Sequence, residues 1–144
     1  QGATVKVSTI MSSPVVTVHL DDRLSAVREI FSRTRFHHLI VVEHGKLFGV
    51  VSDRDLLKAI SPNIGKGAER DADTATLNKR VHQIMSRKPI FLQEESSVLD
   101  AIRLFDEHAV SCIPIVNPDN TPVGILSWRD IIKAIRAVSQ KEKP

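Results

Sequence analysis

Apolar residues along the chain form two kinds of pattern, continuous runs and runs with helical spacing. Continuous runs at residues 39–42 and 113–116 predict strands that are buried on both faces. Shorter apolar stretches predict four further strands, at residues 15–18, 47–51, 90–92 and 123–126. Each group of strands is therefore expected to form a small sheet.

Helices are predicted between and after these strands. Two helices are indicated by apolar residues at helical spacing, namely Leu24, Val27, Ile30 and Phe31, and later Leu99, Ile102, Leu104 and Phe105. Two closing helices carry Leu56, Leu57 and Ile60, and Ile131, Ile132 and Ile135. The predicted starts of the first pair offer capping residues at Asp21 or Asp22 and at Ser96 or Ser97. The element order is β-α-β-β-α, present twice.

The sequence itself repeats in the same way. Residues 49–60 match residues 124–135, 75 positions later, with seven of the twelve positions identical. Ile-Met-Ser at 10–12 recurs at 84–86, 74 positions later. In the first predicted helix, Leu24, Ala26 and Val27 are matched with Leu99, Ala101 and Ile102. The repeats predict two units, at residues 4–61 and 78–138, with a polar linker loop at 62–77 and a frayed tail at 139–144.

Length and composition sharpen this organisation. A chain of 144 residues suits one domain or two very small ones. A unit of about 60 residues is marginal alone, so we expect the two repeats to share a core. The 20 basic and 17 acidic side chains give a net charge of +3 and are spread evenly over the two halves. The pI of about 9.3 is therefore weak support for nucleic-acid binding, which we do not expect.

Further function classes are excluded or disfavoured by what the sequence lacks. A single cysteine, Cys112, excludes an intrachain disulfide and a cysteine-based zinc site, and it fits a cytoplasmic protein. No apolar run is long enough to span a bilayer, and no signal-peptide pattern is present. The chain begins at Gln1 rather than Met, so we expect a processed or trimmed product, and the sequence leaves open whether it is a full protein or a module excised from a longer one. The six histidines show no metal-ligand spacing, and no nucleophile–base pair or Walker-type loop indicates an enzyme.

Three motifs occur in order in both halves. They are Ile-Met-Ser, the strand segment 36–42 matched by 110–116, and Gly-x-x-Ser-x-x-Asp. Together they make the chain resemble a tandem pair of cystathionine-β-synthase-type (CBS) domains, the Bateman module. The resemblance implies an α/β (α+β) fold in which two units pack sheet to sheet with pseudo-two-fold symmetry. It also implies a homodimer that regulates an effector protein by binding AMP, ADP, ATP or S-adenosylmethionine in clefts between paired units.

The motif Gly-x-x-Ser-x-x-Asp has two interpretations. It comprises Gly49, Ser52 and Asp55 in the first half and Gly124, Ser127 and Asp130 in the second. Its spacing matches a capping box, which satisfies free N–H groups at a helix start. A carboxylate can also accept hydrogen bonds from the two hydroxyls of a ribose, and a helix start suits phosphate. The family resemblance implies the second role, with the aspartates on ribose and the serines near phosphate, and the two roles can coexist.

The two halves differ next to this motif. His37 and His38 precede the first buried strand, whereas Ser111 and Cys112 occupy the matching places. The resemblance implies that basic residues here reach phosphates, although adjacent strand residues point to opposite faces. Other candidate contacts each have a simpler interpretation: the arginines as solvated residues, the valine and phenylalanine as core residues, and the tryptophan as an interface or partly buried residue. They are Arg54 and Arg129 for phosphate, Val16 and Phe91 for an adenine, and Trp128 for a base.

These observations favour a non-enzymatic regulatory module that senses adenine nucleotides or related adenosyl ligands, with no obligatory cofactor and no metal. The alternative is a dimerisation or protein-interaction module with one functional ligand site or none. The asymmetry between His37-His38 and Ser111-Cys112 motivates the weaker form of that alternative, in which one site functions.

Overall fold

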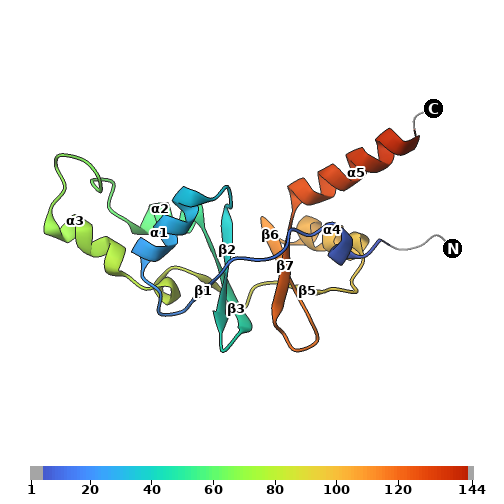
Figure 1. Ribbon diagram of the computed structural model, residues 1–144, viewed down its shortest axis with the longest axis horizontal. Helices are drawn as coiled ribbons and strands as arrows, with labels where there is room; N and C mark the ends of the chain where they lie inside the picture. Colours follow the sequence, from blue (N-terminus) through green and yellow to red (C-terminus); the bar gives the residue numbers. More distant parts are fainter. Residues whose placement is uncertain (1–4, 143–144) are drawn as a thin grey trace. The chain divides into compact units, whose positions relative to one another are not determined.

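The computed structural model describes residues 5–142 and divides the chain into two compact units (Figure 1). We call Val16–Pro89 the central unit, and Gln1–Val15 together with Ile90–Pro144 the terminal unit. Each unit holds one small sheet and its own hydrophobic core. The mixed α/β fold class is confirmed.

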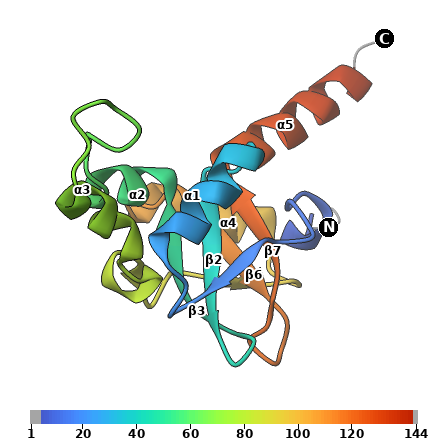
Figure 2. The same cartoon turned by 60° about the vertical axis from the view of Figure 1, so that its left-hand side comes forward.

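The central unit is built on a four-stranded sheet in the order β1-β2-β3-β4. Its strands are β1 (Thr17–His19), β2 (His38–Glu43), β3 (Lys46–Ser52) and β4 (Ser86–Arg87). Strand β1 runs parallel to β2, and the other neighbours are antiparallel. Helices α1 (Leu24–Arg33) and α2 (Asp53–Ala59) lie side by side next to the sheet in both views (Figure 2). Their apolar faces enter a core that includes Leu24, Val27, Leu39, Val51 and Leu56.

The terminal unit has a three-stranded sheet in the order β5-β6-β7. Its elements are β5 (Leu92–Gln93), α4 (Val98–Glu107), β6 (Cys112–Val116), β7 (Pro122–Ser127) and α5 (Trp128–Glu142). A 3₁₀ turn at Val7–Thr9 places Val7 in the core with Ala101, Phe105, Ile113 and Leu126. All five residues of β6 are buried, as the continuous apolar run predicts.

The two Ile-Met-Ser segments each pack with the strands of the other repeat. Ser86 belongs to β4 and pairs with Val50 of β3, so it joins the central unit. Ser12 forms an isolated bridge with Ile125 of β7, so it joins the terminal unit. The compact units therefore divide the chain differently from the sequence repeats 4–61 and 78–138, and Thr4 lies outside the described residues.

The motif glycines explain how these segments fit. A Cβ on Gly49 would lie 2.6 Å from the backbone oxygen of Ser86 and 3.0 Å from Met85 Sδ. A Cβ on Gly124 would collide with the side chain of Met11. Both glycines are buried, and both allow close approach by a crossing segment. The Gly-x-x-Ser-x-x-Asp and Ile-Met-Ser motifs are thus mutually packed parts of one structure.

The alignment of the repeats within the first helix is wrong by one residue. Leu24, the first residue of α1, is completely buried, whereas Leu99 is 68% exposed. The first residue of α4 is Val98, which packs against the core and is the true counterpart of Leu24. By the same shift, Phe31 corresponds to Phe105. The change in length between the repeats lies in the hairpin turn after β2 and β6, where an extra residue is tolerated.

The segment predicted as the linker loop contains regular structure. It includes helix α3 (Asp71–Ala75) and part of a 3₁₀ turn at Thr76–Asn78. Asp73 holds the segment together, because Oδ1 accepts a 2.6 Å hydrogen bond from Ser61 Oγ and Oδ2 accepts one of 2.9 Å from Arg70 N. The hydrogen bond from Ser61 is the main reason why the pKa of Asp73 is lowered.

Two other local predictions differ from the structure. The predicted frayed tail begins at residue 139, but α5 continues to Glu142, and residues 143–144 lie outside the described part. Helix α1 has no side-chain cap, because Asp22 Oδ2 instead accepts a 2.8 Å hydrogen bond from His19 N. Ser97 caps α4 as predicted, in a capping box with Asp100.

Candidate functional site

The Ser-x-x-Asp motif forms a reciprocal cap at the start of a helix in both units. In the central unit, Asp55 N donates a 3.0 Å hydrogen bond to Ser52 Oγ, and Ser52 N donates one of 2.9 Å to Asp55 Oδ2. In the terminal unit, Asp130 N donates to Ser127 Oγ at 3.4 Å, and Ser127 N donates to Asp130 Oδ2 at 2.9 Å. The capping interpretation is therefore correct, and any ligand contact would use groups that the cap leaves free.

The two aspartates differ in their remaining oxygen atom. Asp130 Oδ1 accepts a 3.3 Å hydrogen bond from Ser12 Oγ. Asp55 Oδ1 has no hydrogen-bond partner among residues 5–142. Asp55 also borders a hollow of about 210 Å³ with Lys58, Ala59 and Ile84. Of the two motif carboxylates, Asp55 is the one with free acceptor capacity.

The histidines lie at the same end of the central sheet as this cap. His38 is the first residue of β2 and stands opposite Ser52 in the strand register. His37 is exposed, and its Nδ1 lies 2.8 Å from Asp53 Oδ2. Burial lowers the pKa of His38 below its ordinary value of 6.5, although Asp53 and Asp55 oppose the shift. The partly buried imidazole is therefore held mainly in its neutral form near neutral pH.

The depressed pKa of His38 predicts a pH-dependent stability. Because the unfolded chain binds the proton more readily, the contribution of His38 to stability is fully present above pH 6.5 and is lost as the pH falls through the folded pKa. His38→Gln is expected to make the stability curve flatter between pH 7.5 and 5. Urea denaturation across this range measures the effect. Parallel curves for the two proteins would contradict the prediction.

Three of the other four candidate residues are placed as their simpler interpretations predict, but the expectation that Phe91 is a core residue is wrong. Arg54 and Arg129 are exposed on their helices. Val16 packs against the core of the central unit, and Phe91 is 44% exposed. The structure therefore brings together Ser52, Asp55 and His38 in the central unit, and it leaves these four residues outside that group.

Two features of the site could not be found by searching for ligand motifs. Ser12 contacts Asp130 across 118 residues of sequence, and only the recurrence of Ile-Met-Ser hints at its importance. Asp53 pairs with His37 and stands where the second repeat has Trp128. That difference within an otherwise matched motif is the signal that points to it.

The remaining chemistry of the described residues is sparse. Cys112 is buried, and burial raises the pKa of its thiol to about 12, so the thiolate is scarce at neutral pH. Residues 5–142 contain no cluster of three histidine, cysteine or acidic side chains suited to a metal. None of the helices in this part of the chain has the length and apolar character that crossing a membrane requires.

The sequence comparisons identify similar proteins. The family model described as the CBS domain matches residues 7–62 and 81–137. A CBS domain-containing protein from Dictyostelium discoideum is 28% identical over 142 residues, which cover 97% of each chain. An uncharacterised protein from Methanocaldococcus jannaschii is 30% identical over 132 residues, covering 90% of this chain and 44% of the relative. The chain thus spans under half the length of the second relative.

A solved structure gives a similar result. The CBS domain pair of protein MJ0100, in complex with 5′-methylthioadenosine and S-adenosyl-L-methionine, aligns with a TM-score of 0.76 at 25% identity. The alignment covers 94% of this chain and 98% of that one. The fold of this chain is therefore that of a CBS domain pair.

Proposed function

We propose a function from the premise that this chain belongs to the CBS domain family. It is a non-enzymatic regulatory module that binds an adenine nucleotide or a related adenosyl ligand. Asp55 is the observation that carries this proposal. Its Oδ1 is free to accept hydrogen bonds, and a hollow lies beside it. A carboxylate in this setting suits the adjacent hydroxyls of a ribose. The similar domain pair of MJ0100, which is in complex with two adenosyl compounds, supports the ligand class.

Binding is proposed to be unequal in the two halves. The carboxylate of Asp130 already accepts hydrogen bonds from Ser127 and from Ser12. A ribose at this position must replace the hydrogen bond from Ser12, whereas a ribose at Asp55 replaces none that involves Oδ1. His38, beside Ser52 in the sheet, adds a group that can contact a phosphate on the same side. We therefore assign the stronger ligand contact to Asp55.

A thermal-shift panel tests the function. The panel contains AMP, ADP, ATP, S-adenosylmethionine and GTP. At 100 times its dissociation constant, a ligand adds about 2.7 kcal/mol of stability, or roughly 5–10 °C for a chain of this size. We expect a shift with at least one adenosyl compound and a smaller one with GTP. The absence of any shift would overturn the proposal.

A matched pair of variants tests the assignment to Asp55. Asp55→Asn and Asp130→Asn each keep a side-chain oxygen that can accept the capping hydrogen bond. We expect Asp55→Asn to weaken ligand binding about tenfold or more, since a hydrogen bond to a charged group is lost. Asp130→Asn is expected to change it much less. Calorimetry measures both affinity and stoichiometry, and equal losses would contradict the assignment.

An interaction role is supported by a separate observation on α5. Trp128, Ile132, Ile135 and Val138 recur at helical spacing and are 41–61% exposed. Figures 1 and 2 show α5 extending beyond the strands of its own unit. We propose that this apolar stripe pairs with a second copy of the chain, in a cytoplasmic homodimer that signals to an effector protein. Isologous pairing buries the same stripe on both copies.

The dimer has its own test. Ile132→Glu places a charge in the centre of the stripe and is expected to convert the dimer into a monomer. Lys133→Glu, an exposed residue on the side of α5 away from the apolar stripe, alters charge on the same helix and serves as the control. Sedimentation velocity measures the oligomeric state. A monomeric wild-type chain, or a dimer that survives Ile132→Glu, would contradict the proposal.

A further inference from the structure

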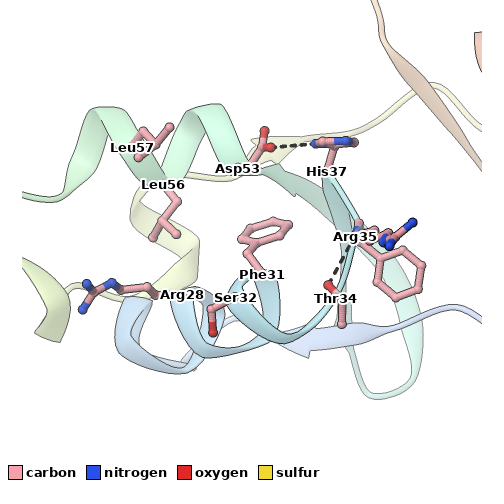
Figure 3. A pocket seen from close by; sticks show the side chains of 10 residues that line it. Arg28, Phe31, Ser32, Thr34, Arg35, His37, Asp53, Leu56 and Leu57 are labelled. Atoms are coloured by element: carbon pink, nitrogen blue, oxygen red, sulfur yellow. Dashed lines mark hydrogen bonds and ion pairs between the residues drawn. The ribbon is translucent and has the colours of Figure 1, made fainter.

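A second pocket lies on the helical side of the central unit, between α1 and α2 (Figure 3). Its volume is about 330 Å³, which is within the range of small-molecule sites. The ring of Phe31 lies inside it, below Asp53 and between Leu56 and Arg35. This pocket shares no lining residue with the hollow beside Asp55. It is therefore a separate feature of the same unit.

The second repeat shows what fills the equivalent space. Phe31 corresponds to Phe105, and Asp53 corresponds to Trp128, because both pairs hold the same place in their helices. In the terminal unit, the rings of Phe105 and Trp128 pack with centroids 4.9 Å apart and planes inclined by 32°. Phe105, which also belongs to the core of that unit, is 6% exposed. In the central unit, Asp53 is too small to cover Phe31, so a space for a planar ring stays open.

The rim of the pocket is cationic. Arg28 and Arg35 line it, and the one lining carboxylate, Asp53, is already paired with His37 at 2.8 Å. Arg35 has no hydrogen bond or ion pair from its side chain within residues 5–142. Arg28 interacts weakly with Glu69, so Arg35 is the guanidinium with more free capacity. A guanidinium binds a carboxylate through paired hydrogen bonds.

We propose that this pocket binds a small planar aromatic acid, whose ring stacks on Phe31 as Trp128 does on Phe105, and whose carboxylate is held by Arg35 with help from Arg28. His37 and Asp53 form one wall of the pocket and adjoin His38 and Ser52 at the motif cap. Occupancy would thus change the surroundings of the motif cap without using Asp55. The proposal does not rest on the adenosyl function and can hold if that function fails.

Ligand-observed NMR and calorimetry test the site with three probes of similar shape. We expect indole-3-acetate to bind, neutral indole to bind more weakly and cationic tryptamine to bind weakest. Arg35→Gln is expected to raise the dissociation constant for indole-3-acetate about tenfold or more and to leave that for indole nearly unchanged. Arg33→Gln is the control, because Arg33 lies two residues before Arg35, at the end of α1, and does not line the pocket. This variant should match the wild type.

A filling variant tests the comparison with the second repeat. Asp53→Trp copies Trp128 and is expected to cover Phe31 and abolish indole-3-acetate binding. Asp53→Asn keeps the pocket open and should retain binding, and far-UV circular dichroism checks that both variants fold. No binding of indole-3-acetate, or equal binding by Asp53→Trp, would overturn the proposal. Displacement of the probe by AMP with matching affinity would also overturn it, by showing a single nucleotide site.

Discussion

Leu24→Ala is expected to lower the free energy of unfolding by about 2–5 kcal/mol, whereas Leu99→Ala should lower it by no more than about 0.5 kcal/mol. Both leucines lie in the first turn of a helix, and the 75-residue offset of the Gly-x-x-Ser-x-x-Asp motif aligns them. Leu24 is completely buried in the core of the central unit, so its removal leaves a cavity. Leu99 is 68% exposed and leaves none.

Urea denaturation followed by circular dichroism measures both changes. Val98→Ala extends the test, because Val98 takes the place in α4 that Leu24 has in α1 and packs against its core. We expect Val98→Ala to be more destabilising than Leu99→Ala, although the side chain that it shortens is smaller. If Leu99→Ala lowered the free energy of unfolding as much as Leu24→Ala, the result would support the alignment of Leu24 with Leu99, which the structure contradicts.

The one-residue error in aligning α1 with α4 shows what sequence patterns leave undetermined. The buried strands β2 and β6 were predictable because a short continuous apolar run is typical of a strand that is covered on both faces. The start of α4 was harder, because Val98 and Leu99 are both apolar and only one can face the core. The capping box identifies the right one, since Ser97 and Asp100 fix where the first turn begins.

The exchange of the Ile-Met-Ser segments was not predictable from the repeat alone. A repeated sequence indicates that two units have the same parts, but either copy of a part can complete either unit. The deciding contacts are long-range, such as the pairing of Val50 with Ser86 and the bridge between Ser12 and Ile125. The capping role of Ser52 and Asp55 was predictable, because it depends only on residues three positions apart.

The differences between the repeats carry most of the functional argument. The cap is present twice, but Ser12 occupies one oxygen of Asp130 and Asp55 keeps one oxygen free. The ring of Phe105 is covered by Trp128, but that of Phe31 lines an open pocket. In both comparisons, a side chain of the terminal unit itself contacts the carboxylate oxygen or the ring. The matching oxygen and ring of the central unit stay open to a ligand. The central unit is therefore the half in which we expect ligands to bind.

Gly49→Ala is expected to destabilise the protein by about 1–3 kcal/mol or more, because the new methyl group would meet backbone that cannot rotate away. The obstacle is the oxygen of Ser86, 2.6 Å from the position of the Cβ, in a strand that pairs with β3 at Gly49 and Val50. Relief of the clash requires β4 to move from β3. Removing the neighbouring methionine should therefore not restore the stability of Gly49→Ala. Met85→Ala is instead expected to lower the stability further, because it adds a cavity.

Gly124→Ala is the matched control, because there the obstacle is the side chain of Met11. Methionine is flexible, so part of the clash can be relieved by rotation, and Met11→Ala should relieve more of it. The two double-mutant cycles are therefore expected to differ. For Gly124→Ala with Met11→Ala, the double variant should lose less unfolding free energy than the sum of the two single variants. For Gly49→Ala with Met85→Ala, it should lose at least that sum. Denaturant unfolding of the six variants and the wild type provides the free energies. Rescue of Gly49→Ala by Met85→Ala would show that the methionine, and not the backbone of β4, excludes a side chain at that position.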